Sequence, residues 1–240
     1  MSLTARDLNA ALWAAADEMR LVMSADVYKD YLLGLVFYKA LSDKILVEAY
    51  ELLNDEKPES LEAAQKAYEE AGKNSEVWSD LQAELEDRFG CAIRPRMTFS
   101  AFYQQINERT FMLDDLSQAF RDVEAASGGV YAGLFDDFDI QSKDLGKTPD
   151  KRNSMISTVI TKLAAIDFSQ YPEDALGDAY EYLISQFASE SGKKAGEFYT
   201  PQAVSTLIAR IVTYGQDTKY GFTVYDPACG SGSLLLLYQG

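Results

Sequence analysis

The sequence of 240 residues contains no histidine, and this absence excludes several kinds of active site. Without an imidazole there can be no Ser-His-Asp or Cys-His nucleophilic pair and no His-Glu-x-x-His zinc site. The two cysteines, Cys91 and Cys229, are too far apart for a Cys-x-x-Cys metal knuckle and too few for a disulfide framework. We therefore expect two free thiols in a cytoplasmic protein.

Positive charge is also scarce, and long apolar runs are missing. The chain has 22 Lys and Arg against 38 Asp and Glu, a formal net charge of −16, so this chain alone is expected to bind DNA poorly. No stretch approaches the roughly 20 apolar residues of a membrane span. The amino terminus carries acidic residues and lacks the continuous apolar run of a signal peptide. A hydrophobic share of 47% nevertheless provides enough apolar side chains for a packed core.

The first 170 residues have the pattern of a helical domain. After Thr4 one apolar stripe recurs at helical spacing, and after Ser24 a longer stripe continues for about seven turns. We predict that this second helix is the central element of the domain. The two stripes are Leu8, Leu12, Ala15 and Met19, and then Val27, Tyr31, Leu35, Tyr38, Leu41, Ile45, Ala49 and Leu52. Further helices are expected at residues 99–106, 113–123, 150–165 and 174–188, with a break at Gly128-Gly129.

Two acidic segments of this domain indicate solvent-exposed surface. Residues 54–74 are rich in Glu, Lys and Ala and predict a solvated loop that leads to an exposed helix. Residues 134–145 contain four aspartates but lack the Asp-x-Asp/Asn-x-Asp/Asn-Gly spacing of a calcium loop. We expect a surface turn there and no metal site.

The character of the chain changes after Phe187. A small, polar stretch is followed by Thr200-Pro201, which predicts a capped helix running to about Thr213 and a turn near Gly215. Residues 222–226 then predict a buried strand, and the glycine-containing segment after it leads into a helix. This order is that of the first half of a β-α unit in a doubly wound sheet.

The segment from Asp226 to Ser233 has the features of a nucleotide-type loop. Two glycines allow backbone N–H groups to approach a ligand at the carboxyl end of a strand. A dinucleotide fingerprint is disfavoured because Leu235 stands where it needs its third glycine, which makes an NAD-dependent oxidoreductase the weakest candidate. A phosphate-binding P-loop is excluded because no lysine follows Gly232.

The loop resembles a known cofactor site. Asp226-Pro227-Ala228-Cys229-Gly230-Ser231-Gly232-Ser233 is similar to the S-adenosylmethionine-binding loop of DNA adenine-N6 methyltransferases, and Gly196-Glu197-Phe198-Tyr199-Thr200-Pro201 to their motif before the first strand. The pair follows a long helical domain, and this arrangement resembles that of the modification (M) subunit of type I restriction-modification systems. Weaker matches occur at residues 28–35, 41–44 and 176–183.

The resemblance implies a fold, a cofactor and a set of site residues. The fold is a mainly α-helical amino-terminal domain, residues 1–170, followed by the beginning of an α/β Rossmann-like methyltransferase domain, residues 171–240. The implied S-adenosylmethionine contacts are Glu197, Phe198, Tyr199, Thr200, Pro201, Gln202, Asp226, Pro227, Ala228, Gly230, Ser231, Gly232 and Ser233. No catalytic residue is identified, and Cys229 is interpreted as a small loop residue because it lacks a histidine partner.

Simpler structural roles remain open for several of these residues. Thr200-Pro201 also suits an ordinary helix start, Phe198 and Tyr199 also suit a core, and Asp226 also suits a turn.

The motif that would hold the target adenine is missing. Adenine-N6 methylation flips the base out of the duplex, and the family holds it with an Asn/Asp-Pro-Pro-aromatic motif. The six prolines here are all isolated, and a single strand with a stub of helix cannot bury its own faces. We expect a fragment that does not catalyse by itself, taken from a subunit that works with DNA, a specificity subunit and a restriction subunit. The alternatives are a free-standing DNA adenine methylase and a non-catalytic helical interaction module.

Overall fold

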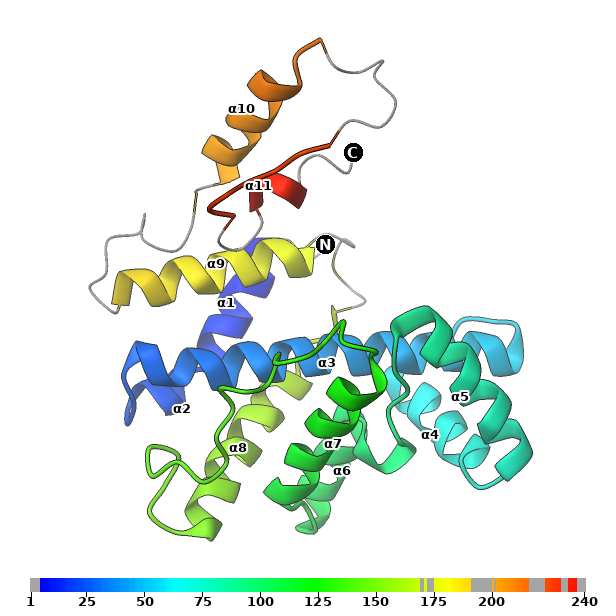
Figure 1. Cartoon of the computed structure of the whole chain (residues 1–240). Helices are drawn as coiled ribbons and strands as arrows, with labels where there is room; N and C mark the ends of the chain where they lie inside the picture. The colour runs from blue at the N-terminus through cyan, green and yellow to red at the C-terminus, as the bar shows by residue number, and fades with distance from the viewer. Residues whose placement is uncertain are drawn as a thin grey trace. The chain divides into compact units, whose positions relative to one another are not determined.

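The computed structural model describes residues 5–168, 171, 175–190, 200, 202–215, 223–229 and 233–236, and it divides into the units Met1–Leu183 and Ile184–Gly240. Every regular element among these residues is a helix (Figure 1). The helices are α1 (Ala5–Ala15), α2 (Asp17–Arg20), α3 (Ala25–Asn54), α4 (Leu61–Ala71), α5 (Ser75–Phe89), η1 (Pro95–Met97), α6 (Phe99–Glu108), α7 (Leu113–Ala126), α8 (Pro149–Ala164), α9 (Ala175–Glu190), α10 (Gln202–Thr213) and α11 (Ser233–Leu236).

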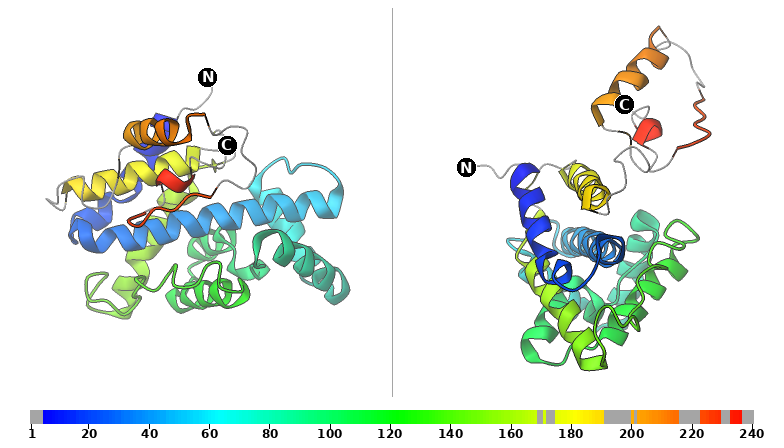
Figure 2. Two further views of the ribbon diagram at one scale, coloured as in Figure 1. Left: turned by 45° about the horizontal axis from the view of Figure 1, so that its top comes forward. Right: turned by 90° about the vertical axis from the view of Figure 1, so that its left-hand side faces the viewer.

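The long helix α3 is the centre of the first unit, as predicted. It packs against α2, α4, α5, α6 and α8 (Figures 1 and 2). Most of its predicted stripe is buried, including Tyr31, Leu35, Tyr38 and Ile45, whereas Leu52 near its end is 37% exposed. The shorter stripe, divided between α1 and α2, is also buried: Leu8, Leu12, Ala15 and Met19 are each 1% exposed or less. Apolar spacing therefore identified the buried faces correctly.

Several helices begin where a short polar side chain accepts a backbone N–H bond. Ser60, Asn74, Thr98 and Thr148 accept hydrogen bonds from the first turns of α4, α5, α6 and α8. Each bond satisfies one of the donors that a helix start leaves without a partner. Proline at the first position of α8, Pro149, adds a backbone already restricted to a helical angle.

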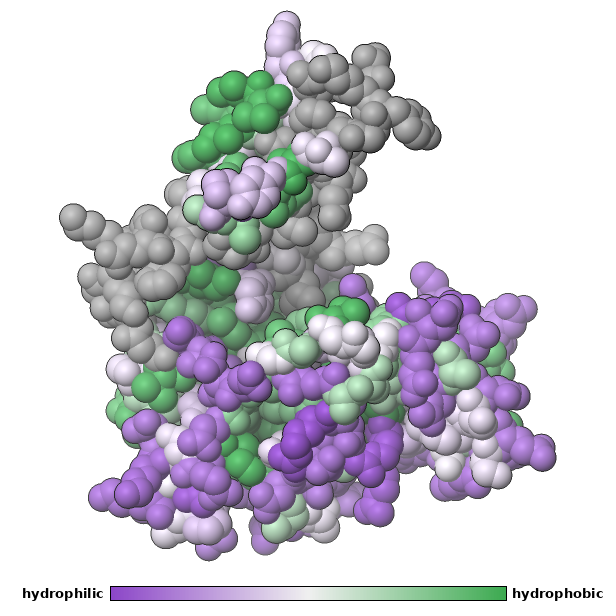
Figure 3. All heavy atoms as spheres, viewed as in Figure 1, coloured by the Kyte–Doolittle hydropathy of each residue, from purple (hydrophilic) through white to green (hydrophobic). Residues whose placement is uncertain are grey.

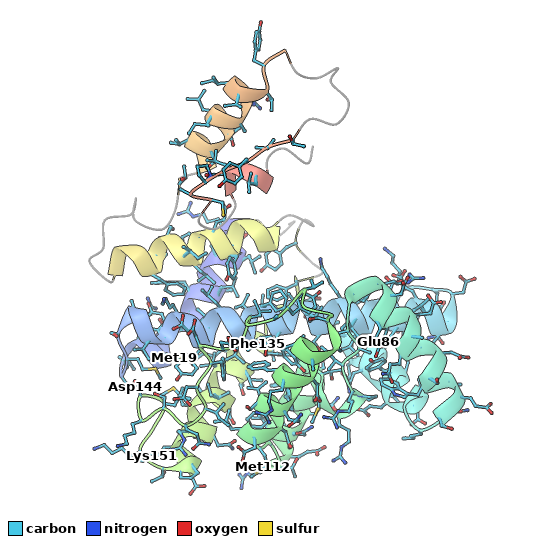
Figure 4. All side chains as sticks on the ribbon, viewed as in Figure 1. Met19, Glu86, Met112, Phe135, Asp144 and Lys151 are labelled. Carbon is cyan, nitrogen blue, oxygen red and sulfur yellow. The ribbon has the colours of Figure 1, made fainter. Side chains whose placement is uncertain are left out.

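The two acidic segments contain more buried side chains than the sequence predicted. Helix α4 is not simply exposed, because Ala64, Gln65, Tyr68 and Ala71 form a buried face and α4 packs against α3. The segment 134–145 does consist of turns with exposed aspartates, but Phe135 and Phe138 are buried within it. The Phe135 ring stacks on Phe120 of α7 with the centroids 4.0 Å apart, where the loop passes beside α3 (Figure 4). These aromatic anchors fix the loop on the domain.

The predicted strand is not present in the described part of the second unit. Residues 223–226 have no regular secondary structure, Phe222 lies outside the described residues, and the Tyr225 side chain is 86% exposed. A strand needs a neighbour for its backbone hydrogen bonds, and no described segment pairs with this one. The prediction of a buried strand is therefore wrong for residues 223–226, and the observed fold is mainly helical.

Candidate functional site

The first predicted motif leads into α10. The helix begins at Gln202 and ends at Thr213, close to the predicted bounds, and Gly215 after it has the positive φ of 75° that a turn requires. Thr200 is half-buried, and its backbone carbonyl accepts a hydrogen bond from Ser205 Oγ at 3.3 Å. Ser205 is itself fully buried. This bond ties the end of the motif to the first turn of α10, and the sequence pattern gave no signal for the role of Ser205.

The second motif forms a tight turn at Asp226. Its Oδ1 atom accepts a hydrogen bond from the backbone N–H of Ala228 at 2.9 Å, while Pro227 and Ala228 are exposed. This is an Asx turn, the simpler structural role that the sequence allowed for Asp226. The turn uses one carboxylate oxygen, and Oδ2 has no hydrogen-bond partner among the described residues. The half-buried Asp226 therefore shapes the loop.

The helices that follow the two motifs pack against each other. α10 contacts α11, and Figures 1 and 2 draw α11 beside the amino-terminal end of α10. Gln202 and Ser233 are the first residues of these two helices. The packing thus places two helix starts, each following a predicted cofactor motif, in one part of the second unit. A helix start carries free N–H groups and a partial positive charge, so it suits an anionic group.

Seven predicted site residues fall on the parts of the chain that the structure does not describe. Glu197, Phe198, Tyr199, Pro201, Gly230, Ser231 and Gly232 lie outside the described residues.

One face of α10 is apolar and exposed. Along one stripe at helical spacing, Val204, Leu207, Ile208 and Ile211 are between 37% and 65% exposed. Green, hydrophobic atoms gather over this helix in Figure 3. The small residues Ser205 and Ala209 are the buried ones instead. Within the second unit, the most apolar side of α10 is therefore not covered by the described residues.

The described residues offer neither a metal cluster nor a membrane span. They contain no group of three or more His, Cys, Asp or Glu side chains that could hold a metal ion. None of the helices that the structure describes is both long and apolar enough to cross a membrane.

Two family models match successive parts of the chain. The model described as HsdM N-terminal domain matches residues 8–163, and the model described as N-6 DNA Methylase matches residues 171–239.

Curated relatives and a solved structure are similar over nearly the whole chain. The type I restriction enzyme MpnII methylase subunit of Mycoplasma pneumoniae is 32% identical over 239 residues, which are 94% of this chain and 42% of that protein. The MjaVIII methylase subunit of Methanocaldococcus jannaschii is 31% identical, over 87% of this chain and 32% of that protein. The crystal structure of a type I restriction-modification system methyltransferase subunit from Streptococcus thermophilus matches with a TM-score of 0.90 and 48% identity, over 97% of this chain and 49% of that one. The chain thus spans less than half the length of each of these proteins.

Proposed function

The chain belongs to the HsdM N-terminal domain family, and we propose that it forms the amino-terminal part of a type I restriction-modification methylation subunit that methylates adenine N6 in DNA. The observation that carries this proposal is the agreement in fold and sequence with the Streptococcus thermophilus methyltransferase subunit over 97% of the chain. At 48% identity, that agreement includes the helical domain as well as the region of the two motifs.

We assign the helical domain to residues 1–170 and the start of the methyltransferase domain to residues 171–240. The matched family models support this division, since one ends at residue 163 and the other begins at residue 171. Under this assignment the methyltransferase part begins just before α9 and includes both cofactor motifs.

The proposed cofactor is S-adenosylmethionine, and the described donors and acceptors fit it. Its methionine carboxylate suits the start of α10 after Thr200, where free N–H groups and the helix dipole favour an anion. Its amino and hydroxyl groups suit the Oδ2 acceptor of Asp226. We propose the same role for the remaining motif residues: Glu197, Phe198, Tyr199, Pro201, Gln202, Pro227, Ala228, Gly230, Ser231, Gly232 and Ser233. When bound, the cofactor supplies the methyl group.

We propose that the described motif residues hold and orient the cofactor. The Asx turn fixes the direction of the loop, and the Ser205 bond fixes the backbone of Thr200 at the start of α10. We infer that the 240 residues alone do not catalyse, because no Asn/Asp-Pro-Pro-aromatic motif occurs among them. Correct placement of the base relative to the methyl group is the step that this motif would provide.

The proposed partners are DNA, a specificity subunit and a restriction subunit. A net charge of −16 opposes direct binding to phosphates, so DNA affinity is expected to come from the partner that reads the sequence.

A methyl-transfer assay tests the proposal. Radiolabelled S-adenosylmethionine and DNA are supplied to the 240-residue chain, and in parallel to the longer subunit together with its specificity subunit. We expect label in adenine N6 only in the second reaction. Methylation by the 240-residue chain would contradict its proposed inactivity, and absence of label from the complete complex would contradict the proposed function.

Two variants of Asp226 distinguish its role in the turn from its role as a charged ligand of the cofactor. Asp226→Asn keeps an oxygen that can accept the Ala228 N–H bond, whereas Asp226→Ala removes it. We expect Asp226→Asn to weaken S-adenosylmethionine binding by the longer subunit about tenfold, and Asp226→Ala to weaken it further because the turn is lost as well. Calorimetric titration measures both, and equal affinity of all three proteins would exclude a cofactor role for this side chain.

A further inference from the structure

A polar groove lies within the unit Met1–Leu183 and is not part of the two motifs. Its volume is about 880 Å³, and its walls come from α4, α5, η1, α6 and α7. That space can receive several side chains of a ligand or partner.

The loop of residues 93–97 contributes four lining residues to the groove: Arg94, Pro95, Arg96 and Met97. Four of its five backbone carbonyls accept hydrogen bonds from side chains of three different helices. Tyr68 Oη donates to Ile93 at 2.7 Å, and Gln65 Nε2 donates to Pro95 at 2.9 Å. Gln105 Nε2 donates to Arg96 at 2.8 Å, and Tyr38 Oη donates to Met97 at 2.6 Å. The loop therefore holds its own side chains, Arg94 and Arg96, on a rigid backbone.

Three of the six charged side chains that line the groove have partners. Lys73 Nζ lies 2.5 Å from Glu70 Oε1, and Arg94 pairs with Asp122 of α7. Glu69 accepts a hydrogen bond from Gln65 at 2.7 Å. Three lining side chains have neither an ion pair nor a hydrogen bond among the described residues: the exposed Arg96, Glu108 and Asp115.

An apolar strip lies beside these charges. Trp78 is half-buried, with its ring edge-to-face against Tyr68 at 5.4 Å, and Pro95 and Met97 line the same groove. Trp, Met and Arg are the residue types enriched where proteins contact one another. The groove combines them on a backbone that does not have to be ordered on binding, which lowers the entropy cost of association.

We propose that this groove docks a mixed-charge helix of a partner protein. The helix would present a carboxylate to Arg96, a basic side chain to Glu108 or Asp115, and an apolar side chain to Trp78. An acid and a base four residues apart share one face of a helix, and a helix packs its side chains between those of neighbouring helices. A nucleic acid or another polyanion fits less well, because Glu108 and Asp115 would face its phosphates with like charge.

The test uses Trp78 as the reporter. Trp13 and Trp78 are the two tryptophans of the chain, so Trp13→Phe leaves Trp78 as the single indole fluorophore. The probe is an alanine-based helical peptide with Glu and Lys four residues apart and one leucine on the same face. The comparison ligands are the same peptide with every Lys changed to Glu, the same peptide with every Glu changed to Lys, and a short DNA duplex.

We expect the mixed-charge peptide to change Trp78 emission saturably and to bind more tightly than the other three ligands. Arg96→Gln should weaken binding about three- to tenfold, whereas Arg6→Gln, at an exposed site on α1, should leave it unchanged. Arg96→Glu should bind the Lys-only peptide better than the parent chain does, because the new charge suits it. Thermal unfolding verifies that the variants remain folded.

The proposal is wrong if the mixed-charge peptide gives no saturable change, or if the all-acidic peptide or the DNA binds at least as tightly. Equal binding by the Arg96→Gln and parent chains would also refute it. These outcomes are independent of methyl transfer, so they do not depend on the proposed function.

Discussion

The Nζ atom of Lys39 lies 2.5 Å from Oδ2 of Asp43, and both side chains are buried on the central helix α3. Two aromatic rings complete the surroundings of the ammonium group: Phe99 at 5.3 Å and Phe168 at 5.0 Å from Nζ. The second carboxylate oxygen, Oδ1, is buried without a hydrogen-bond partner in the described part of the chain. An acceptor buried in this way destabilises the ionised form of Asp43.

The stability of the helical domain should therefore depend on the ionisation of Asp43. Burial raises the pKa of Asp43 to about 6, the opposing effect of Lys39 is smaller, and Asp167 adds to the rise. Because the folded pKa lies above the ordinary value of 3.8, the folded state binds the proton more tightly than the unfolded state. This contribution to stability is complete below about pH 4 and is lost as the pH rises through about 6.

Asp43→Asn removes that titration and provides the test. We expect the free energy of unfolding of the parent chain, relative to the variant, to fall by on the order of 2–3 kcal/mol between pH 4 and pH 7. Urea unfolding at several pH values measures the difference. Asp80→Asn, at an exposed site on α5, is the control for removing one surface carboxylate. A difference that stayed constant across this range would mean that Asp43 does not titrate there.

Removing one hydroxyl that holds the loop 93–97 should lower the free energy of unfolding measurably. Tyr68 is fully buried, and its hydroxyl donates to the Ile93 carbonyl. Tyr68→Phe leaves that carbonyl without its donor inside the protein, which should cost about 1–3 kcal/mol of unfolding free energy. Tyr103 on α6 is half-buried, and its hydroxyl has no hydrogen-bond partner among the described residues, so Tyr103→Phe should cost much less. Similar losses in the two variants would argue against the role of the loop bond.

How far the sequence predicts this structure depends on the kind of interaction involved. Apolar periodicity located α3 and its buried stripe, because helix burial follows a repeat that the sequence displays directly. The same reasoning missed Phe135 and Phe138, which are buried from a loop rich in aspartate. Their anchoring contacts come from the preceding helix α7 and from the distant helix α3, and no local period reveals them.

The candidate site shows the same limit. The bounds of α10 and the turn at Gly215 followed from local signals. The strand predicted over residues 222–226 did not form in the described part, because a strand depends on a neighbour that local sequence cannot supply. The hydrogen bond from Ser205 to Thr200 was likewise not predictable, since a serine in a first turn has many possible partners.

The two cysteines should differ sharply in reactivity. Cys91 is completely buried, and burial raises the pKa of its thiol to about 11, so it carries almost no thiolate at neutral pH. Cys229 is exposed in the glycine-containing segment. We expect a disulfide reagent to titrate one thiol quickly in the native chain and two in denaturant.

Cys229→Ala provides the matched control for this assignment. In this variant, the reagent should modify no thiol rapidly in the native state and one thiol in denaturant. Rapid modification of a thiol in the native variant would mean that Cys91 is accessible and that its surroundings are less tightly packed than the structure indicates.

Two glycines offer opposite responses to the same substitution. Gly146 has a φ of 155°, and a Cβ added there would lie 2.6 Å from Lys151 Cβ and 3.0 Å from the backbone nitrogen of Arg152. The segment before α8 approaches the first turn of that helix at Lys151 (Figure 4), and the helical backbone there cannot shift easily to make room for a methyl group. Gly146→Ala should therefore destabilise the chain by about 1–3 kcal/mol.

Gly177 in α9 is the converse case. It has no described atom within 4 Å of an added Cβ, and its φ is not in the left-handed region. Gly177→Ala should raise the unfolding free energy by up to about 1 kcal/mol, because alanine loses less backbone freedom in a helix. Thermal unfolding of both variants compares them on one scale. If both substitutions shifted the midpoint in the same direction, backbone angle and local space would not explain the two positions.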